Sequence, residues 1–281
     1  MHPVIYLNKT MVEATKARVA PVSSAMLYGR GVFTTLAIHN AKPFLWAKHW
    51  ERLVAHAGKL AIELSSLTEK NVGDALRKLI AVNQVKDGRA RVILLARSGR
   101  DVWKPKATST RNTDLIIMTG EPHKKPANGL SLAVSPYRVS TFSPTSGIKS
   151  LNYLDHVLAW EEAQTRDFDE AVMLNERGEI VSGTLANIFW STNGTVHTPA
   201  LSTGAMAGIT RECVLDIAAK HFIPVVEGVY EMADLTEADE IFLTSSGLGI
   251  AQVTTFDFRR YNVEQASLVG TLNGAFSKLT A

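Results

Sequence analysis

Apolar residues recur at the three- and four-residue spacing of a helix in five stretches of the chain. We predict helices over residues 48–61, 68–85, 151–166 and 209–221, and a closing helix that carries Leu268, Leu272, Phe276 and Leu279. Thr68 suits the N-cap of the second helix, because its hydroxyl can accept an early main-chain N–H. The third helix is predicted to bury one stripe formed by Leu151, Leu154, Val157 and Leu158.

β-Prone runs separated by turn residues alternate with these helices. The predicted strands cover residues 4–7, 11–13, 32–38, 43–46, 89–97, 113–119, 130–135, 170–174, 179–181, 186–191, 225–230 and 240–243. The stretch EPHKKPANG at 121–129 concentrates proline, lysine and glycine between two strands, which is typical of a linker. We therefore predict an α/β (α+β) protein with an N-terminal α/β domain at 1–120, a linker at 121–129 and a C-terminal α/β domain at 130–281.

Composition excludes several classes of protein. The chain has 281 residues, of which 46% are hydrophobic and 20% charged, as in ordinary globular proteins. Its net charge is +3 and it has no run of lysine or arginine, so binding to nucleic acid or to an anionic membrane is not predicted. The single cysteine, Cys213, fits a reducing compartment, and no apolar run approaches the ~18 residues of a membrane span. We expect a soluble cytoplasmic protein.

One lysine stands between a predicted loop and the start of a predicted helix, where a side chain can be held in a fixed place. Lys149 follows a loop of serine, proline, threonine and glycine at 143–147 and precedes the predicted helix 151–166. An amine held inward at such a place is desolvated, loses its proton and becomes a nucleophile that can form a Schiff base. The alternative is a solvated lysine beside a helix start, since most lysines are exposed.

Two segments in the second half have the chemistry of anion sites. Gly208 precedes the predicted helix 209–221, whose first amides are open to a phosphate. Thr244, Ser245 and Ser246 precede a glycine at a strand end, where hydroxyls and amides suit an anion.

Metal chemistry and a serine-hydrolase nucleophile have no support in the sequence. The eight histidines are scattered, and His49 and His56 form an i, i+7 pair without a third ligand. The chain contains no HExxH, no paired CxxC and no GxSxG motif, so no metal site is predicted. A phosphorylated aldehyde cofactor remains, because it needs a lysine, an arginine and anion-binding element ends.

The order of these motifs resembles the class IV aminotransferases, the fold-type IV enzymes that use pyridoxal 5′-phosphate (PLP), over nearly the whole chain. The matching segments are YGRGVFTT, Arg52 within HWERL, KSLNYL, GEIVSGTLANIFW, GITRE and IFLTSSGLGIAQV. The resemblance implies two α/β domains with the cofactor between them, a small-molecule substrate and a homodimer.

Residue by residue, the resemblance implies that Lys149 forms the Schiff base with PLP and then moves the substrate proton. Arg52 is implied to bind the cofactor phosphate, as are Ser246 and the Thr210 hydroxyl. The main-chain amides of Ile209 and Thr210 are implied to bind it as well. Tyr153 is implied to lie near the phenolic oxygen of the cofactor, and Tyr28 and Phe33 in the substrate pocket.

One position departs from the family pattern. Where the family usually has a glutamate that keeps the pyridine nitrogen protonated, this chain has Ser182, just after the predicted strand 179–181. A hydroxyl cannot stabilise a pyridinium as a carboxylate does, so a weaker electron sink is expected. Glu179 is an odd number of residues away and faces the other side of the strand, so we do not expect it to substitute.

Two segments bear on the substrate. Thr35, in the sequence FTT, resembles the 4-amino-4-deoxychorismate lyases, and Ala37 stands where branched-chain aminotransferases usually carry an arginine. Arg97 and Arg100, in the turn RSGR, fall where several family members bind substrate carboxylates, and deoxychorismate has two.

Three activities are consistent with these residues. The first is a PLP-dependent lyase that converts 4-amino-4-deoxychorismate to 4-aminobenzoate and pyruvate, a step of folate synthesis. The second is a class IV aminotransferase acting on branched-chain or D-amino acids. The third is a PLP-binding protein with weak catalysis, for which Ser182 is the reason.

Overall fold

The computed structural model describes residues 1–64, 67–97, 113–124, 126, 128–261 and 267–280. The chain divides into two compact units. Unit 1 comprises Met1–His123 together with Ile148–Asn152, and unit 2 comprises Lys124–Gly147 and Tyr153–Ala281. The linker predicted at 121–129 and the domain bounds beside it remain our proposal.

Unit 1 is built on a six-stranded antiparallel sheet with the strand order β2-β1-β6-β5-β3-β4. Its strands are β1 Val4–Leu7, β2 Thr10–Glu13, β3 Gly31–His39, β4 Lys42–Pro43, β5 Gly88–Ala96 and β6 Thr113–Gly120. Its helices are α1 Ser24–Tyr28, α2 Trp46–Lys59 and α3 Glu69–Val82, with a short 3₁₀ helix at Ala14–Lys16. The predicted opening hairpin and the predicted helix pair are confirmed.

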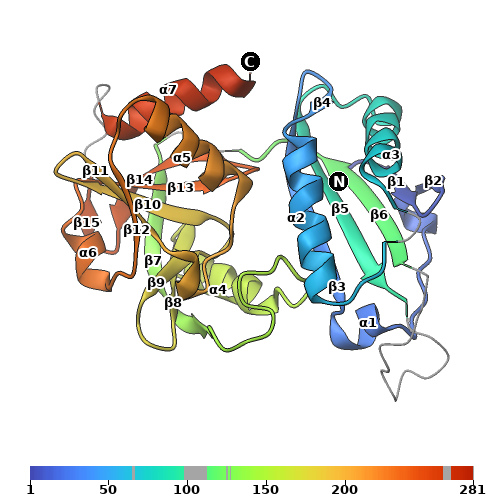
Figure 1. The fold of residues 1–281 in the computed structure, drawn as a ribbon, viewed down its shortest axis with the longest axis horizontal. Coiled ribbons are helices and arrows are strands. Elements are labelled where there is room, and N and C mark those ends of the chain that lie inside the picture. The colour runs from blue at the N-terminus through green and yellow to red at the C-terminus, as the bar shows by residue number, and fades with distance from the viewer. Residues whose placement is uncertain (65–66, 98–112, 125, 127, 262–266, 281) are drawn as a thin grey trace. The chain divides into compact units, whose positions relative to one another are not determined.

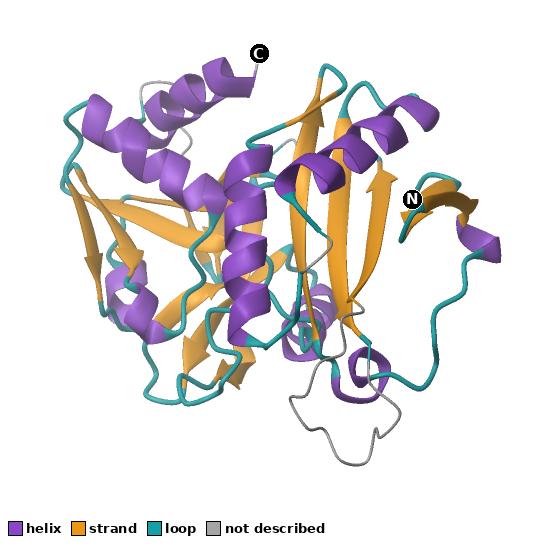
Figure 2. Cartoon of the chain, turned by 45° about the vertical axis from the view of Figure 1, so that its right-hand side comes forward, coloured by secondary structure: helices purple, strands orange, loops and turns teal. Residues whose placement is uncertain are grey.

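Helices α2 and α3 cover one face of this sheet (Figures 1 and 2). Side chains alternate along β3, and Val32, Leu36 and Ile38 are fully buried under the helices. Leu53 of α2 and Leu76 of α3 meet them in the same core. The Thr68 hydroxyl caps α3 by accepting the Asn71 N–H at 3.2 Å, as predicted. Along β3, Phe33 and Thr35 alternate with the fully buried residues and therefore point to the opposite face of the strand.

The five residues Ile148–Asn152 join unit 1 as a short extended segment beside the start of β3. The Phe33 N–H donates to the Lys149 carbonyl at 3.0 Å, and the Leu151 N–H donates to the Gly31 carbonyl at 3.0 Å. Ser150 forms an antiparallel bridge with Val32. Lys149 is thus placed by sheet hydrogen bonds.

Unit 2 contains a nine-stranded mixed sheet. Eight strands follow the order β12-β11-β10-β13-β14-β7-β8-β9, and β15 pairs with β14. The strands are β7 Leu130–Val139, β8 Glu170–Asn175, β9 Ile180–Gly183, β10 Asn187–Thr192, β11 Thr195–Pro199, β12 Val225–Gly228, β13 Glu240–Ser245, β14 Gly249–Phe256 and β15 Arg259–Arg260. The helices are α4 Leu154–Thr165, α5 Ile209–Lys220, α6 Met232–Thr236 and α7 Leu268–Thr280, with a 3₁₀ helix at Leu201–Thr203.

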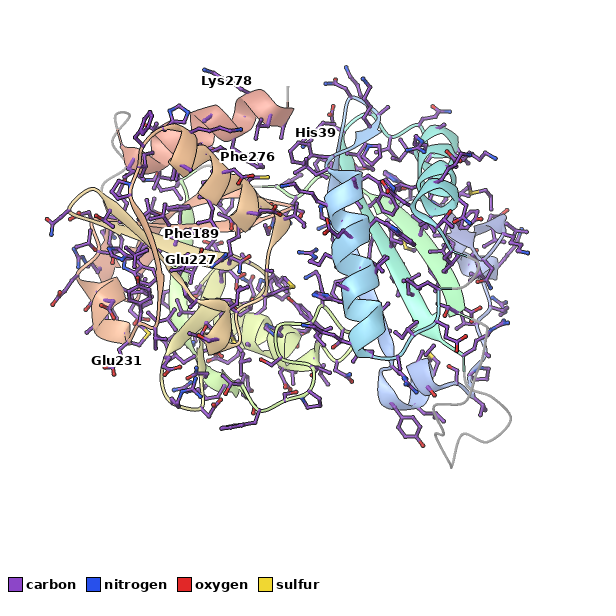
Figure 3. All side chains as sticks on the ribbon, in the orientation of Figure 1. His39, Phe189, Glu227, Glu231, Phe276 and Lys278 are labelled. Carbon is purple, nitrogen blue, oxygen red and sulfur yellow. The ribbon has the colours of Figure 1, made fainter. Side chains whose placement is uncertain are left out.

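Aromatic stacking and one ion pair stabilise the part of unit 2 near α5. Phe189 of β10 stacks on Phe242 of β13 with ring centroids 5.0 Å apart (Figure 3). Arg211, buried in α5, pairs with Glu227 of β12, which is labelled in Figure 3. This ion pair ties the N-terminal turn of α5 to the sheet. Across the described parts of both units, no helix is long and apolar enough to cross a membrane.

Two predictions about local structure are wrong. The stripe expected to be buried in the helix after Lys149 is largely exposed, with Leu154 64% and Leu158 40% accessible. The helix α4 packs on β7 and β8 through Ala159 and Ala163 instead, because small side chains allow a helix to approach a sheet closely.

The strand predicted at 43–46 is the second error. Strand β4 ends at Pro43, and Trp46 begins α2, with its indole N–H bonded to the Glu69 carbonyl at 3.3 Å. An apolar run of four residues does not distinguish a strand from a helix start. The sequence prediction also omitted the strands Thr195–Pro199 and Gly249–Phe256.

Substitution of Gly31 by alanine tests whether the Lys149 segment depends on this edge of β3. A Cβ at Gly31 would lie 2.5 Å from Leu151 Cδ1 and 2.9 Å from the Leu94 carbonyl oxygen. We expect Gly31→Ala to cost about 1–3 kcal/mol of stability through overpacking. It should also speed hydrogen exchange at the Leu151 amide.

Gly58→Ala in α2 is the matched control, because a Cβ there meets nothing within 4 Å. In a helix this change is expected to stabilise by about 0.5–1 kcal/mol. Equal stability and equal Leu151 exchange in the two variants would contradict the proposed dependence.

Candidate active site

Lys149 Nζ lies 4.7 Å from the centroid of the Phe33 ring on β3. Burial lowers the pKa of this amine to about 7, and the nearby guanidinium groups of Arg52 and Arg91 contribute to the shift. The pKa thus lies close to neutral pH, where both the protonated and the neutral amine are populated. A solvated surface lysine, the alternative that the sequence left open, would not have its pKa lowered by burial in this way.

Arg52 is held through a chain of hydrogen bonds from α2 to β3. Its Nη2 donates to Thr34 Oγ1 at 3.0 Å, and the same oxygen lies 2.7 Å from His49 Nδ1. A guanidinium only donates, so Thr34 Oγ1 accepts from Arg52 and at the same time links it to the His49 ring. Burial, together with the charges of Arg52 and Lys149, lowers the pKa of His49 to about 3, so this ring stays neutral.

Arg91 was missed by the sequence analysis. Its guanidinium carbon lies 4.7 Å from the Phe33 ring centroid, and its Nε donates to Thr35 Oγ1 at 3.1 Å. Thr35 and Arg91 are direct partners in the register of β3 and β5. The alternation of polar and apolar residues in β5 was visible in the sequence, but the strand register was not. Unit 1 therefore gathers Lys149, Phe33, Thr35 and Arg91.

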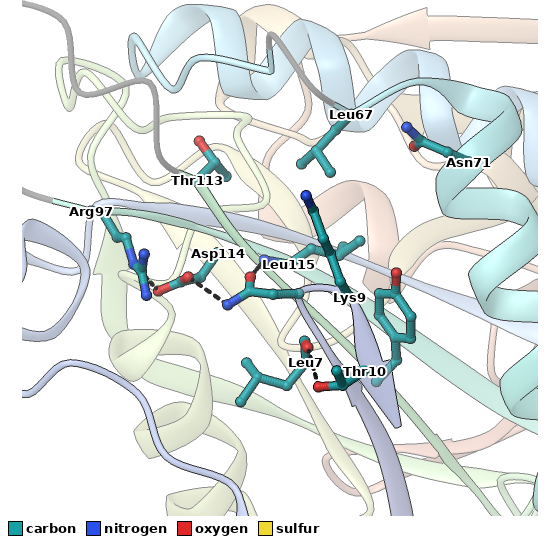
Figure 4. A pocket seen from close by; sticks show the side chains of 11 residues that line it. Leu7, Lys9, Thr10, Leu67, Asn71, Arg97, Thr113, Asp114 and Leu115 are labelled. Carbon is teal, nitrogen blue, oxygen red and sulfur yellow. Dashed lines mark hydrogen bonds and ion pairs between the residues drawn. The ribbon is translucent and has the colours of Figure 1, made fainter. Parts of the chain in front are cut away.

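The other three predicted substrate residues are Arg97, Tyr28 and Arg100. Arg97 Nε donates to Asp114 Oδ2 at 3.0 Å, in a pocket of about 810 Å³ that Lys9 and Asn71 also line (Figure 4). Tyr28 ends α1 and is 52% exposed. Arg100 lies outside the described residues. Their substrate roles stay predictions.

In unit 2, Ser182 is 8% exposed and lies opposite Met173 of β8. It lies within β9, whereas the sequence analysis placed it just after the strand. The loop after it is fixed by the buried carboxylate of Glu170. That carboxylate accepts the main-chain N–H of Thr184 at 2.9 Å and of Leu185 at 3.0 Å, and also the Thr184 hydroxyl. Burial raises the pKa of Glu170, although these donors oppose the shift.

Tyr153 is tied to the same loop. Its ring stacks on His156 with centroids 4.4 Å apart and an interplanar angle of 14°. The His156 Nδ1 donates to the Thr184 carbonyl at 2.9 Å. Two residues predicted to surround the cofactor ring, Tyr153 and Ser182, are therefore connected through His156 and Thr184.

The start of α5 is shaped for an anion. Gly208 is its N-cap, and a Cβ at this position would collide with Asn187 Oδ1. Ile209 and Thr210 begin the helix and are buried. Thr244 stands opposite Asn187 in the register of β10 and β13, and its buried Oγ1 has no hydrogen-bond partner among the described residues. Phosphate oxygens would satisfy that hydroxyl and the first amides of α5.

These observations fit PLP. Unit 1, taken by itself, has a lysine of lowered pKa and an oriented arginine. Unit 2, taken by itself, has a buried Thr244 hydroxyl in β13 without a hydrogen-bond partner among the described residues. Ser246 follows β13 and is partly exposed. Within the described residues, His, Cys, Asp and Glu do not form a group of three that could hold a metal ion.

Comparison with known proteins supports the same conclusion. A family model described as amino-transferase class IV matches residues 31–256. A candidate branched-chain-amino-acid aminotransferase of Methanocaldococcus jannaschii is 32% identical over 93% of this chain and 90% of its own length. The aminodeoxychorismate lyase of Bacillus subtilis is 30% identical over 98% of this chain and 94% of its own.

A solved structure gives the same fold. The branched-chain amino acid aminotransferase of Escherichia coli superposes with a TM-score of 0.90 at 26% identity, covering 100% of this chain and 95% of that one. The predicted α/β fold-type IV architecture is thereby confirmed.

The pKa of Lys149 gives a direct test. Trace labelling of the full chain with acetic anhydride, followed by peptide mass analysis, should show a Lys149 rate that rises with pH and is half-maximal near pH 7. Below that pH the amine is protonated and unreactive, and above it the neutral amine reacts. Labelling of the exposed Lys59 in the same samples corrects for reagent decay. A midpoint above pH 9 would contradict the described environment.

Proposed function

The chain belongs to the class IV aminotransferase family of PLP-dependent enzymes, and we propose that it is a PLP-dependent lyase acting on 4-amino-4-deoxychorismate. The products would be 4-aminobenzoate and pyruvate. The observation that carries the proposal is the Lys149 amine, whose pKa is about 7 and which shares the Phe33 ring with Arg91.

The cofactor-binding residues that we propose come from both units. In unit 1, Lys149 would bind PLP covalently and Arg52 would neutralise phosphate charge. In unit 2, the Ile209 and Thr210 amides, the Thr210 hydroxyl and Ser246 would donate to the phosphate, and the Thr244 hydroxyl would gain a partner. Tyr153 and Ser182 would border the cofactor ring.

PLP, when bound, supplies an electron sink that makes loss of a proton beside the substrate amine feasible. The pKa of the Lys149 amine is close to physiological pH, so the amine could take this proton and later return it to the methylene carbon of the departing pyruvate. The substrate carries two carboxylates. Arg91 presents a guanidinium next to that amine, and a guanidinium matches a carboxylate in charge and in planar geometry.

The leading alternative is a class IV aminotransferase acting on branched-chain or D-amino acids. It is favoured by the relative in Methanocaldococcus jannaschii, whose 32% identity is slightly above the 30% of the Bacillus subtilis lyase. In that case a keto acid would be an obligatory co-substrate.

We further propose a cytoplasmic homodimer. The support is an apolar surface on α4 and the loop after β9, where Leu154, Leu158, Trp160 and Leu185 are exposed. A second copy of the chain would bury such a surface.

The reaction assignment has a simple test. With substrate formed in a coupled synthesis, the protein loaded with PLP should release 4-aminobenzoate without any added keto acid. Lys149→Ala should lower the rate at least about 10³-fold, since the proton shuttle is lost. A strict requirement for a keto acid would assign the chain to the aminotransferases.

Ser182→Glu tests the electron sink. A carboxylate at this position can stabilise a protonated pyridine nitrogen, so conversion of PLP to its amine form by D-alanine or L-leucine should speed up. We expect about tenfold, equivalent to about 1.4 kcal/mol.

The control for added charge is Ser202→Glu, at an exposed residue of the same unit. Circular dichroism of both variants checks that the buried glutamate is tolerated in β9. Unchanged conversion in a folded Ser182→Glu protein would mean that another group governs the ring nitrogen.

A further inference from the structure

Helix α2 presents three polar side chains on one buried stripe. His49, Arg52 and His56 stand at i, i+3 and i+7, so they lie on the same side of the helix. His49 and His56 are 1% and 6% exposed. His49 reaches Arg52 through Thr34, as described above. His56 has a different partner, and that partner is the main chain of Lys149.

The His56 Nδ1 accepts the Lys149 main-chain N–H at 3.1 Å. On the other side of the same residue, the Lys149 carbonyl accepts the Phe33 N–H at 3.0 Å. Both main-chain polar groups of Lys149 are therefore bonded to unit 1, one to a strand and one to a side chain. This pair of bonds fixes the direction of the Cα–Cβ bond. It therefore also fixes where the Lys149 side chain begins.

The charged groups around His56 keep its ring in the accepting form. Burial lowers the pKa of His56 to about 4, and the charges of Arg52, Lys59 and Lys149 contribute to the shift. At neutral pH the proton of the ring is therefore on Nε2, and Nδ1 is free to accept. Protonation would turn Nδ1 into a donor facing another donor and would add a cation beside Arg52 and Lys149.

We propose that His56 is a positioning residue for Lys149, which acts by accepting its main-chain N–H and so holding the amine over the Phe33 ring. The role of the lysine itself rests on the proposed function. Phe33 and Leu151 provide the strand pairing, and the Lys149 N–H donates to His56. A glycine or aliphatic residue on α2 could not accept that bond. The bond from His56 therefore completes the anchoring of the segment on the side away from β3.

The variants His56→Leu and His56→Asn separate positioning from simple filling of space. Leucine fills the site but has no acceptor, whereas the asparagine Oδ1 can take the place of Nδ1. Val54→Ala, at a 37% exposed position of the same helix, is the control. Each full-length protein, free of PLP, is labelled with acetic anhydride over a range of pH, and the Lys149 midpoint is read by mass analysis.

In His56→Leu the unanchored amine should relax toward water, away from Arg52 and Arg91, so its midpoint should rise by about one pH unit, which lowers the neutral amine at pH 7 about fivefold. His56→Asn and Val54→Ala should keep the parent midpoint. A parent-like midpoint in His56→Leu, or equal shifts in the leucine and asparagine variants, would overturn the proposal. If circular dichroism shows that His56→Leu does not fold, His56→Ala takes its place under the same criterion.

A second readout separates this proposal from the proposed function. Each protein is incubated with PLP and reduced with borohydride, and the mass of the Lys149 peptide is measured. No adduct in the parent would remove the cofactor assignment and would leave the midpoint comparison intact. An adduct in the parent with a midpoint unaffected by His56→Leu would keep the cofactor and reject the positioning role.

Discussion

The pairing of residues 148–152 with the start of β3 is the interaction on which the whole candidate site depends. Two main-chain hydrogen bonds, at Phe33 and Leu151, and one from the Lys149 N–H to the His56 ring determine where this lysine stands. The segment is only five residues long, so it has no core of its own and takes its geometry from the sheet. A catalytic group placed by a sheet edge is held more rigidly than one placed by a loop.

The second constraint is electrostatic. Lys149, Arg52 and Arg91 bring positive groups together, and each disfavours the charged form of the lysine. The buried polar positions next to them are occupied by two histidines whose low pKa keeps them uncharged. Hydrogen bonds can therefore orient Lys149 and Arg52 without neutralising them. Anionic groups such as a phosphate or a carboxylate are the partners that such a cluster favours.

The sequence allowed prediction of those features that depend on local periodicity. Helices α2 and α5 and the Thr68 cap follow from spacing and from one hydroxyl, and all three are present. The stripe on α4 had the same signal but is exposed, because spacing reveals a helix face without revealing what covers it.

The site was predictable to a lesser degree. Lys149, Arg52 and Phe33 were identified by resemblance to a family, and the structure brings them together in unit 1. Arg91 was missed because its place depends on the register of β5 against β3. The i, i+7 pair of His49 and His56 was seen and judged only as a metal site. The structure shows other contacts for the two histidines. His49 is linked to Arg52 through Thr34, and His56 accepts the main-chain N–H of Lys149.

In our proposal Ser182 of β9 borders the cofactor's ring nitrogen, where a hydroxyl would give a weaker electron sink than a carboxylate. The Glu170 carboxylate accepts the Thr184 and Leu185 amides and the Thr184 hydroxyl, so it holds the loop after β9. In transamination the cofactor would have to keep the electrons released by proton removal and take up a proton itself. In elimination they would leave with the oxygen of the departing pyruvate. A neutral amine combined with a weak electron sink would therefore suit elimination better, and this is the reason for which we propose the lyase.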